Sequence, residues 1–279
     1  MQAELRIETV RNSIKRRFPR LVLAVRGTRR FVTWIVDVLD IGLNQLTFGR
    51  GVSKSIRPGI RLRTHPKPWR ESFSYFAAGG SVEEELDAFI RQCNAGMQLI
   101  DVGAQYGIFS LVAMAWPRSR ALLVEPYPKN VQMLSELRRM NSLSDKRFIV
   151  VPVAAGSQDG RVAMEGIDFY LPSPASATFV PMRSLDSLCS EFGFRPTHIK
   201  IDVEGFEFEV LKGAVKVLDQ CMPVVHLEIH DAFLVRDGTA PSEIHNFMRI
   251  HGYDQVWSLV ENEPDGAPSV TRTVWCAKH

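Results

Sequence analysis

Two acidic residues and two glycines between residues 101 and 125 are spaced to bind a ligand that contains a ribose. Asp101 lies near the end of a short apolar run, and the turn after it carries Gly103 and Gly107. Glycines at a strand-to-helix turn allow a sharp bend and a close approach of a ligand or a helix. Glu125 ends the next apolar run, 22 residues after Gly103, where its carboxylate can accept hydrogen bonds from both hydroxyls of a ribose.

The glycine spacing separates two classes of nucleotide-like ligand. Gly103 and Gly107 form a GxxxG pattern, which lacks the middle glycine that lets a pyrophosphate approach the backbone. The pattern therefore disfavours NAD, and with it a nicotinamide-dependent oxidoreductase. A ligand with a ribose, no pyrophosphate and a cationic end near Asp101 fits S-adenosylmethionine. A sheet with a tight turn and no ligand is the alternative that these residues alone leave open.

A second group of acid–base residues follows two later apolar runs. Asp202 and Glu204 come at the end of one run, and Glu228 and His230 end the next. Methyl transfer from a sulfonium is an in-line displacement that needs an aligned acceptor, and a hydroxyl acceptor benefits from a positioned base. We expect Asp202 nearest the transferred methyl group as base or orienting group, Glu204 shaping the site or contacting the acceptor, and His230 as the second candidate base.

Each of these residues also has a simpler interpretation. Asp202 could cap the helix expected to begin near Gly205, and Glu204 could complement the dipole of that helix. The carboxylates of Asp202, Glu204 and Glu228, together with His230, could also bind Mg²⁺. We predict no metal ligand among them but leave a Mg²⁺-assisted reaction open.

Two further polar residues lie within these runs. His226 alternates inward on a buried strand and is expected to be a core histidine whose hydrogen bonds are satisfied, rather than a catalyst. Lys200 lies on the same face of its strand as Asp202, but deeper, and is expected to pair with it.

Apolar runs alternate with helical patterns from residue 98 onward. The runs fall at residues 99–102, 122–125, 148–153, 198–203 and 223–229, and helices are predicted at 108–116, 129–140 and 205–219. Such alternation predicts right-handed crossovers and a parallel sheet covered on both faces. Residues 253–259 and 271–277 predict a final antiparallel hairpin. Residues 156–182, rich in Gly, Pro and Ser, predict an inserted hairpin or lid.

Seven short motifs follow one another between about residues 84 and 260. They are LIDVGAQYGIFS at 99–110, VEPYPKN at 124–130, VAAG at 153–156, SLDS at 184–187, IKIDVEG at 199–205, VLKG at 210–213 and PVVHLE at 223–228. Their order and spacing resemble the FkbM family of S-adenosylmethionine-dependent methyltransferases, and KIDVEG is the most specific of them. In one departure, Gln105 and Tyr106 stand where the family usually has Asn and a small or apolar residue.

The resemblance implies an α/β fold of the Rossmann-like class I methyltransferase type, with a mostly parallel seven-stranded sheet, a terminal antiparallel hairpin and helices on both faces. It implies S-adenosyl-L-methionine as cofactor and O-methylation of a hydroxyl on a saccharide or secondary metabolite. Cofactor contacts are expected at Asp101, Gly103, Ala104, Tyr106, Gly107, Glu125, Pro126 and Ala154. A non-catalytic scaffold or binding module with the same fold is the alternative function.

The net charge of +3 conceals a strong asymmetry. Residues 1–70 carry 16 Lys and Arg against 4 Asp and Glu, whereas residues 71–279 carry 18 against 27. We therefore predict a basic N-terminal helical region over 1–70, for membrane-surface, docking or dimer contacts, and a methyltransferase domain over 71–279. The expected partners are a small-molecule or glycan acceptor and an anionic membrane contacted through residues 1–50, but not nucleic acid; an oligomer is compatible with the sequence.

The four cysteines are widely spaced and include no CxxC pair, so neither a disulfide framework nor a structural zinc site is predicted. The first 20 residues lack the uncharged apolar segment of a cleaved signal peptide. The apolar residues 31–48 are interrupted by Asp37 and Asp40 and do not predict a membrane span. We expect a cytoplasmic protein, with membrane association left open.

Overall fold

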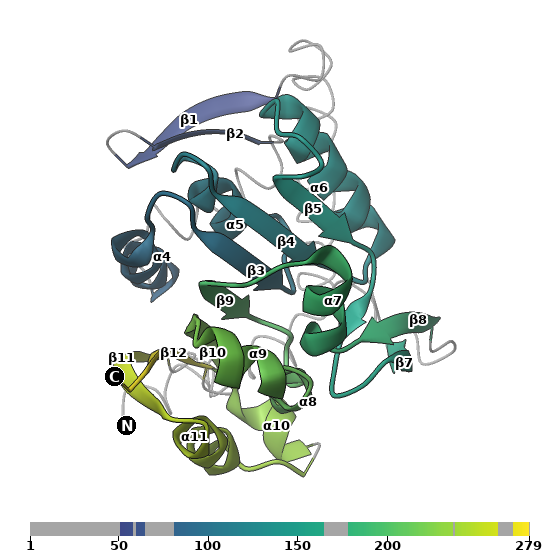
Figure 1. Ribbon diagram of the computed structural model, residues 1–279, viewed down its shortest axis with the longest axis vertical. Helices are drawn as coiled ribbons and strands as arrows, with labels where there is room; N and C mark the ends of the chain where they lie inside the picture. The colour runs from purple at the N-terminus through teal and green to yellow at the C-terminus, as the bar shows by residue number, and fades with distance from the viewer. Residues whose placement is uncertain are drawn as a thin grey trace, which may run out of the picture.

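A seven-stranded sheet forms the centre of the computed structural model, which describes residues 51–57, 60–64, 81–164, 178–236, 238–261 and 270–278 (Figure 1). Its strands lie in the order β11-β12-β10-β9-β3-β4-β5. Their bounds are β3 Gln98–Val102, β4 Arg120–Val124, β5 Phe148–Val151, β9 His198–Ile201, β10 Val224–His230, β11 Tyr253–Glu261 and β12 Val270–Ala277. Strands β3, β4, β5, β9 and β10 pair in parallel, and β12 pairs antiparallel with β10 and with β11. The predicted parallel sheet with a terminal hairpin is confirmed.

The order of the strands reverses beside β3. Strands β4 and β5 extend the sheet on one side of β3, whereas β9 and β10 extend it on the other. Open α/β sheets bind ligands outside the carboxyl ends of their strands at such a reversal, because the loops that follow the two central strands turn to opposite faces. The turn after β3 and the residues after β9 therefore border the place where a ligand is expected.

Helices cover both faces of the sheet (Figure 1). One buried cluster packs α4 (Ser81–Gln92), α5 (Ile108–Ala113) and α6 (Pro128–Met140) against one face. Another packs the opposite face against α7 (Leu185–Phe192), α8 (Glu207–Lys212), α9 (Val215–Cys221), α10 (Asp231–Arg236) and α11 (Pro241–Ile250). Leu122 and Leu123 belong to different clusters, as expected for a strand buried on both sides. Within the described part of the chain, no helix is long and apolar enough to cross a membrane.

A β-hairpin occupies part of the region predicted to be helical. Strands β1 (Val52–Arg57) and β2 (Ile60–Thr64) pair antiparallel, so the helical prediction is wrong over these residues. The reason is a period of two, because Ile60 and Leu62 are buried while Arg61 and Arg63 are exposed. Asn141, at the end of α6, fixes the hairpin by accepting from the Arg63 N–H at 3.1 Å and donating to its C=O at 2.8 Å.

Other parts of the N-terminal prediction lie outside the described residues. These are residues 1–50, 58–59 and 65–70, which include the whole of the segment expected to contact an anionic membrane. The proposed boundary at residue 70 and the membrane contact therefore stay predictions.

The inserted segment forms a second sheet. Strands β6 (Ala154–Ala155), β7 (Gly160–Met164) and β8 (Thr178–Arg183) lie in the order β6-β8-β7, with β7 and β8 antiparallel. The expected hairpin within 156–182 is thus present, while residues 165–177 between its strands lie outside the described part.

The helix predicted over 205–219 is divided into α8 and α9. The carboxylate of Asp186 accepts hydrogen bonds from the backbone N–H groups of Lys216 and Val217, at 3.1 and 3.0 Å, and so supplies α9 with its own N-terminal partner. At the break, a Cβ on Gly213 would lie 2.0 Å from the carbonyl oxygen of Gly156. The break therefore lets α8 and α9 pack closely on the segment that leads into the second sheet.

Gly103 is the point at which the turn after β3 meets the end of β9. Its φ is +75°, and a Cβ at this position would lie 1.8 Å from the carbonyl oxygen of Asp202. Gly103→Ala is expected to lower the free energy of unfolding by roughly 3 kcal/mol or more, because both a left-handed backbone and a backbone clash oppose it.

Urea-induced unfolding measures this loss, with Gly160→Ala as the matched control. Gly160 has nothing within 4 Å of an added Cβ, so its variant should stay within about 0.5 kcal/mol of wild type. Equal stabilities for the two variants would contradict the assigned packing of β3 against β9.

Candidate active site

Glu125 ties together the loops that follow β3 and β4. Its Oε2 accepts a hydrogen bond from the backbone N–H of Gln105, and its Oε1 accepts one from that of Tyr127, both at 2.9 Å. The side chain is buried, which raises the pKa of the carboxyl despite these hydrogen bonds. The Asn130 side chain also hydrogen-bonds this carboxylate, which has about four acceptor positions in all, so it retains the capacity to accept from a ribose hydroxyl.

Asp101 anchors the start of α5. Its Oδ2 accepts hydrogen bonds from the N–H and the hydroxyl of Ser110, at 3.2 and 2.6 Å. Burial of this carboxyl raises its pKa to about 6, although the Ser110 hydrogen bonds and Lys200 oppose the shift. Sequence reasoning placed Asp101 near the cationic end of the ligand and missed Ser110, the third residue of α5.

The other predicted cofactor residues lie in the same loops or directly beside them. Gly107 precedes α5 with a φ of +66°, and a Cβ there would lie 2.7 Å from Leu134 of α6, so this glycine permits close helix packing. Ala104 is buried in the core, Tyr106 and Pro126 are half-buried, and Ala154 forms part of β6. Their contacts with a cofactor stay predictions.

Gln105, which replaces the Asn usual in the family, has a strained backbone conformation. Its φ is +43°, in the left-handed region that asparagine adopts more readily than glutamine does. The Asn usual in the family is therefore the residue that this backbone favours.

A buried ion-pair network lies beneath the carboxyl ends of β9 and β10. The Nζ of Lys200 lies 2.8 Å from Oε1 of Glu85 in α4, 3.2 Å from Oε2 of Glu228 and 4.0 Å from Oδ2 of Asp202. Burial alone would lower the pKa of Lys200, but these carboxylates outweigh it and raise the pKa. The expected pairing with Asp202 is thus the longest contact of the three, and the main partners are Glu85 and Glu228.

Arg272 of β12 completes the network. Its Nη2 donates to Oε1 of Glu228 at 2.7 Å, and its Nε lies 3.3 Å from Oε2 of Glu85. With Lys200 on the other oxygen, these cations lower the pKa of Glu228, although burial alone would raise it. Sequence reasoning missed Arg272 and Glu85. They could have been found as charged residues at positions where the pattern expects a buried apolar residue, Arg272 on a strand and Glu85 on a helix.

His226 differs in part from its prediction. It is fully buried, as expected for a core histidine, and its ring meets the Phe89 ring edge-on at a centroid distance of 5.3 Å. Neither ring nitrogen has a hydrogen-bond partner among the described residues, so the expectation of satisfied hydrogen bonds is wrong. Burial and the nearby Lys200 lower its pKa to about 3, which keeps the ring neutral.

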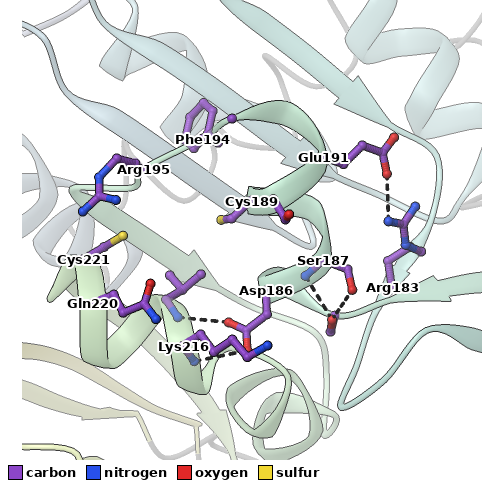
Figure 2. A pocket seen from close by; sticks show the side chains of 14 residues that line it. Arg183, Asp186, Ser187, Cys189, Glu191, Phe194, Arg195, Lys216, Gln220 and Cys221 are labelled. Carbon is purple, nitrogen blue, oxygen red and sulfur yellow. Dashed lines mark hydrogen bonds and ion pairs between the residues drawn. The ribbon is translucent and has the colours of Figure 1, made fainter.

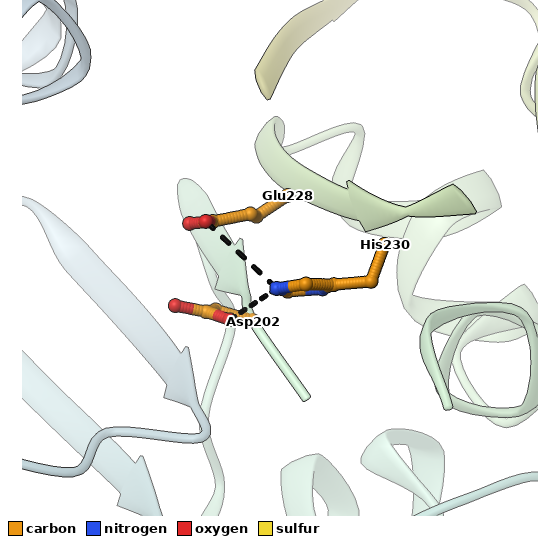
Figure 3. A group of neighbouring side chains, drawn as sticks. All are labelled: Asp202, Glu228 and His230. Atoms are coloured by element: carbon orange, nitrogen blue, oxygen red, sulfur yellow. Dashed lines mark ion pairs between the residues drawn. The ribbon is translucent and has the colours of Figure 1, made fainter. Parts of the chain in front are cut away.

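Asp202, Glu228 and His230 point toward one another from the ends of β9 and β10 (Figure 3). The Nε2 of His230 lies 3.9 Å from Oδ1 of Asp202 and 3.9 Å from Oε1 of Glu228. Desolvation raises the pKa of Asp202 to about 7, with Lys200 opposing the shift and Glu228 adding to it. A carboxyl group with a pKa near neutrality and a histidine ring therefore face each other beside the turn that follows β3.

The alternative in which Asp202 caps a helix is wrong. Helix α8 begins at Glu207, and its N-cap residue is Phe206. Glu204 lies exposed in the turn between Asp202 and this helix, with a left-handed φ of +54°. Burial of part of this side chain raises its pKa, although the nearby His230 opposes the shift.

A family model described as the methyltransferase FkbM domain matches residues 101–254, which is more than half of the chain. The chain belongs to this family. Membership implies S-adenosylmethionine as cofactor. Among curated proteins, no significant match is found.

Solved structures with a similar fold include several methyltransferases. An FkbM methyltransferase from Methylobacillus flagellatus is 21% identical, with a TM-score of 0.45, over 65% of this chain and 44% of its own. The chain thus spans less than half the length of that protein. A protein described as a tRNA (m1A22) methyltransferase from Streptococcus pneumoniae is 14% identical, with a TM-score of 0.44, over 70% of this chain and 69% of its own.

The geometry of the three facing residues does not favour Mg²⁺ in this member of the FkbM family. One ligand atom from each of Asp202, Glu228 and His230 lies within 4.8 Å of the others, so a metal could be held. However, both oxygens of Glu228 already bind cationic groups, those of Lys200 and Arg272, and Mg²⁺ prefers an octahedron of oxygen ligands. Two fixed positive charges beside the site oppose a further divalent cation.

A cavity of about 890 Å³ lies elsewhere, between α7 and α9 (Figure 2). The side chains around it include Cys189, Phe194 and Arg195, and Arg183 on its rim pairs with Glu191 at 2.7 Å. None of the predicted cofactor or catalytic residues lines this cavity. It is therefore separate from the candidate active site.

The ion-pair network predicts a large loss of stability when Lys200 is replaced. Lys200→Met leaves Glu85 and Glu228 buried beside one another with only Arg272 to pair them, and should lower the free energy of unfolding by about 3–5 kcal/mol.

Chemical unfolding at pH 7 provides the measurement. Lys212→Met removes an exposed ion pair with Glu209 and serves as the control, with an expected loss below about 1 kcal/mol. A Lys200→Met protein as stable as this control would show that the network does not hold α4 to the sheet.

Proposed function

We propose that this FkbM methyltransferase transfers a methyl group from S-adenosylmethionine to a hydroxyl oxygen of a saccharide or small metabolite. The observation that carries the proposal is the contact between Gly103 and the Asp202 backbone, because it brings the candidate base beside the cofactor turn. The facing groups of Asp202 and His230 supply what a hydroxyl acceptor needs, namely a proton acceptor at the carboxyl edge of the sheet.

The chain's own residues would hold the cofactor through the turn after β3 and the end of β4. Glu125 would accept a hydrogen bond from the ribose through the acceptor capacity that its bonds with Gln105, Tyr127 and Asn130 leave. S-adenosylmethionine supplies a methyl group on a positively charged sulfur, which leaves as the neutral thioether of S-adenosylhomocysteine.

The acceptor step requires a proton to leave the hydroxyl as its oxygen attacks. The new C–O bond forms while the C–S bond breaks, and the proton passes to Asp202 or His230 at the edge of β9 and β10. The gap of 3.9 Å between Oδ1 of Asp202 and Nε2 of His230 is too long for a direct hydrogen bond, and it admits one oxygen in contact with both.

Glu125→Ala should weaken binding of S-adenosylhomocysteine by about tenfold or more, because hydrogen bonds to a charged group are worth roughly 1.5–3 kcal/mol. Isothermal titration calorimetry measures the affinity, and circular dichroism checks that the two loops still fold. The control is Asp145→Ala. Asp145 is exposed and lies just before β5, at the amino-terminal ends of the strands, whereas Glu125 follows the carboxyl end of β4.

Two outcomes would count against the proposal. Unchanged affinity in Glu125→Ala would remove Glu125 as the ribose ligand. If the wild-type protein bound NAD but neither S-adenosylmethionine nor S-adenosylhomocysteine, the assignment of the cofactor would be overturned.

Asp202→Asn should reduce the rate of methyl transfer by at least about a hundredfold while S-adenosylhomocysteine still binds. Asp202 must lose its proton to act, and its pKa is raised to about 7, so the wild-type rate should rise with pH through neutrality. Single-turnover transfer of a labelled methyl group to hydroxyl-bearing acceptors, across pH 5–9, measures both effects. Asp254→Asn, at an exposed pair with Lys278, is the control.

Near-normal turnover of Asp202→Asn would show that Asp202 is neither the base nor an orienting group for the acceptor. The same assay with and without EDTA separates the metal-assisted alternative, since loss of activity on chelation and recovery with Mg²⁺ would contradict a reaction carried by the protein's own groups.

A further inference from the structure

A fully buried carboxylate lies behind the ring of His230. Glu207, in the first turn of α8, has no exposed surface. Its Oε1 lies 2.9 Å from Nδ1 of His230 and accepts a hydrogen bond from the backbone N–H of Gly205, also at 2.9 Å. Its Oε2 has no hydrogen-bond partner among the described residues. A buried carboxylate costs free energy unless its partners repay it, so this arrangement requires an explanation.

The contact fixes which nitrogen of His230 carries a permanent proton. A carboxylate oxygen that already receives an N–H can only accept, so Nδ1 of His230 must be the donor. Nε2 is then the atom that gains and loses a proton. This nitrogen points at Asp202 and Glu228, 3.9 Å from an oxygen of each, where an acceptor hydroxyl is expected.

Charged groups face His230 from several elements. Glu207 lies on α8, Asp202 on the segment after β9, and Glu228 on β10 itself. Glu204 acts on the ring from the turn before α8, and Lys200 and Arg272 lie behind Glu228. The Phe233 ring covers one side at a centroid distance of 6.0 Å.

The balance of these groups favours a proton on the ring. Burial alone would lower the pKa of His230, but the hydrogen bond with Glu207 and the carboxylates of Asp202 and Glu228 outweigh it and raise the pKa.

We propose that Glu207 is a positioning residue that orients His230 so that Nε2 receives the proton of the acceptor hydroxyl. This inference rests on the proposed function, which it deepens by selecting His230 as the proton acceptor. As the hydroxyl oxygen bonds to the methyl carbon and the C–S bond breaks, the hydroxyl proton moves to Nε2. Glu207 stabilises the imidazolium that forms, and the ring then returns the proton to water.

A purely structural role for Glu207 makes different predictions. Such a role would need only the hydrogen bond to the Gly205 N–H, which shapes the turn after Glu204. An orienting role requires in addition that the charge of Glu207 raise the proton affinity of Nε2. Glu207→Gln separates the two, because the amide oxygen can keep both hydrogen bonds while the charge is lost. Its NH₂ would replace the oxygen that has no partner, so no existing hydrogen bond is displaced.

The decisive measurement is the titration of His230 by NMR in the full-length protein with labelled histidine, assigned with a His230→Asn variant. In Glu207→Gln, the pKa of His230 should fall by about one unit relative to wild type. Glu209→Gln is the matched control, because Glu209 lies two residues away on the same helix and pairs with Lys212 instead. The control should titrate as the wild type does, and an unchanged His230 pKa in Glu207→Gln would overturn the proposal.

Turnover gives a second readout that a structural role would not move. In Glu207→Gln, the acid limb of the pH profile of kcat/KM should shift to lower pH and its plateau should fall at least about tenfold, because a weaker base accepts the proton. Affinity for S-adenosylhomocysteine should stay unchanged. A variant with a shifted His230 pKa but a wild-type profile would overturn the catalytic part of the proposal.

The remaining outcomes are also decisive. If Glu207→Gln fails to fold, the ¹⁵N chemical shifts of His230 in the wild type report its neutral tautomer, and a proton on Nε2 rather than Nδ1 would overturn the proposal without any variant. Lack of wild-type turnover on every hydroxyl acceptor would contradict the proposed function. Normal wild-type turnover with an unchanged His230 pKa in the variant would contradict the role of Glu207 alone.

Discussion

The buried ammonium group of Lys200 stabilises the cluster of carboxylates at the carboxyl ends of β9 and β10. It contacts carboxylates from α4, β10 and the end of β9, and two of these carboxylates, those of Glu85 and Glu228, are shared with Arg272 of β12. Two buried glutamates cannot lie together without positive charge nearby, because the low dielectric of the interior magnifies their repulsion. The direction of the Glu228 side chain, and with it the surroundings of His230, therefore depends on Lys200.

Burial and the same cation together keep the neighbouring His226 neutral. In the sheet, Lys200 stands in register with Asp101 of β3 on one side and with His226 of β10 on the other. A protonated His226 would add a second positive charge next to Lys200 without a carboxylate of its own, and burial already disfavours that state. This face of the sheet thus carries a row of polar residues in which charge is confined to groups that have a partner.

Most of the fold could be predicted from the sequence, because the periodicity of apolar residues is a local property. The five parallel strands, the terminal hairpin and the glycine turn follow from such patterns. The helical prediction is wrong over 52–64 because it follows the high content of basic residues there. The alternation of buried apolar residues with the exposed Arg61 and Arg63 is the pattern of a strand. The break between α8 and α9 depends on Asp186, which lies 30 residues before Lys216.

Only the residues of the candidate site that directly follow or end a strand could be predicted from the sequence. Asp202 and His230 end apolar runs and are visible as chemistry-bearing residues. Glu207 and Arg272 were missed because their roles come from partners distant in sequence, 23 residues away for Glu207 and His230 and 44 for Arg272 and Glu228. Such pairings are created by the order of the strands, which no local window of sequence contains.

The second sheet gives the chain a place where length can change freely. Strand β6 pairs in parallel with β8, Ala154 opposite Met182 and Ala155 opposite Arg183, so the excursion between them leaves and returns at adjacent positions. Closing a longer loop between fixed ends costs only about 0.6 kcal/mol for each doubling of its length. The number of residues in this excursion can therefore differ with little effect on the strands that carry the acid–base groups.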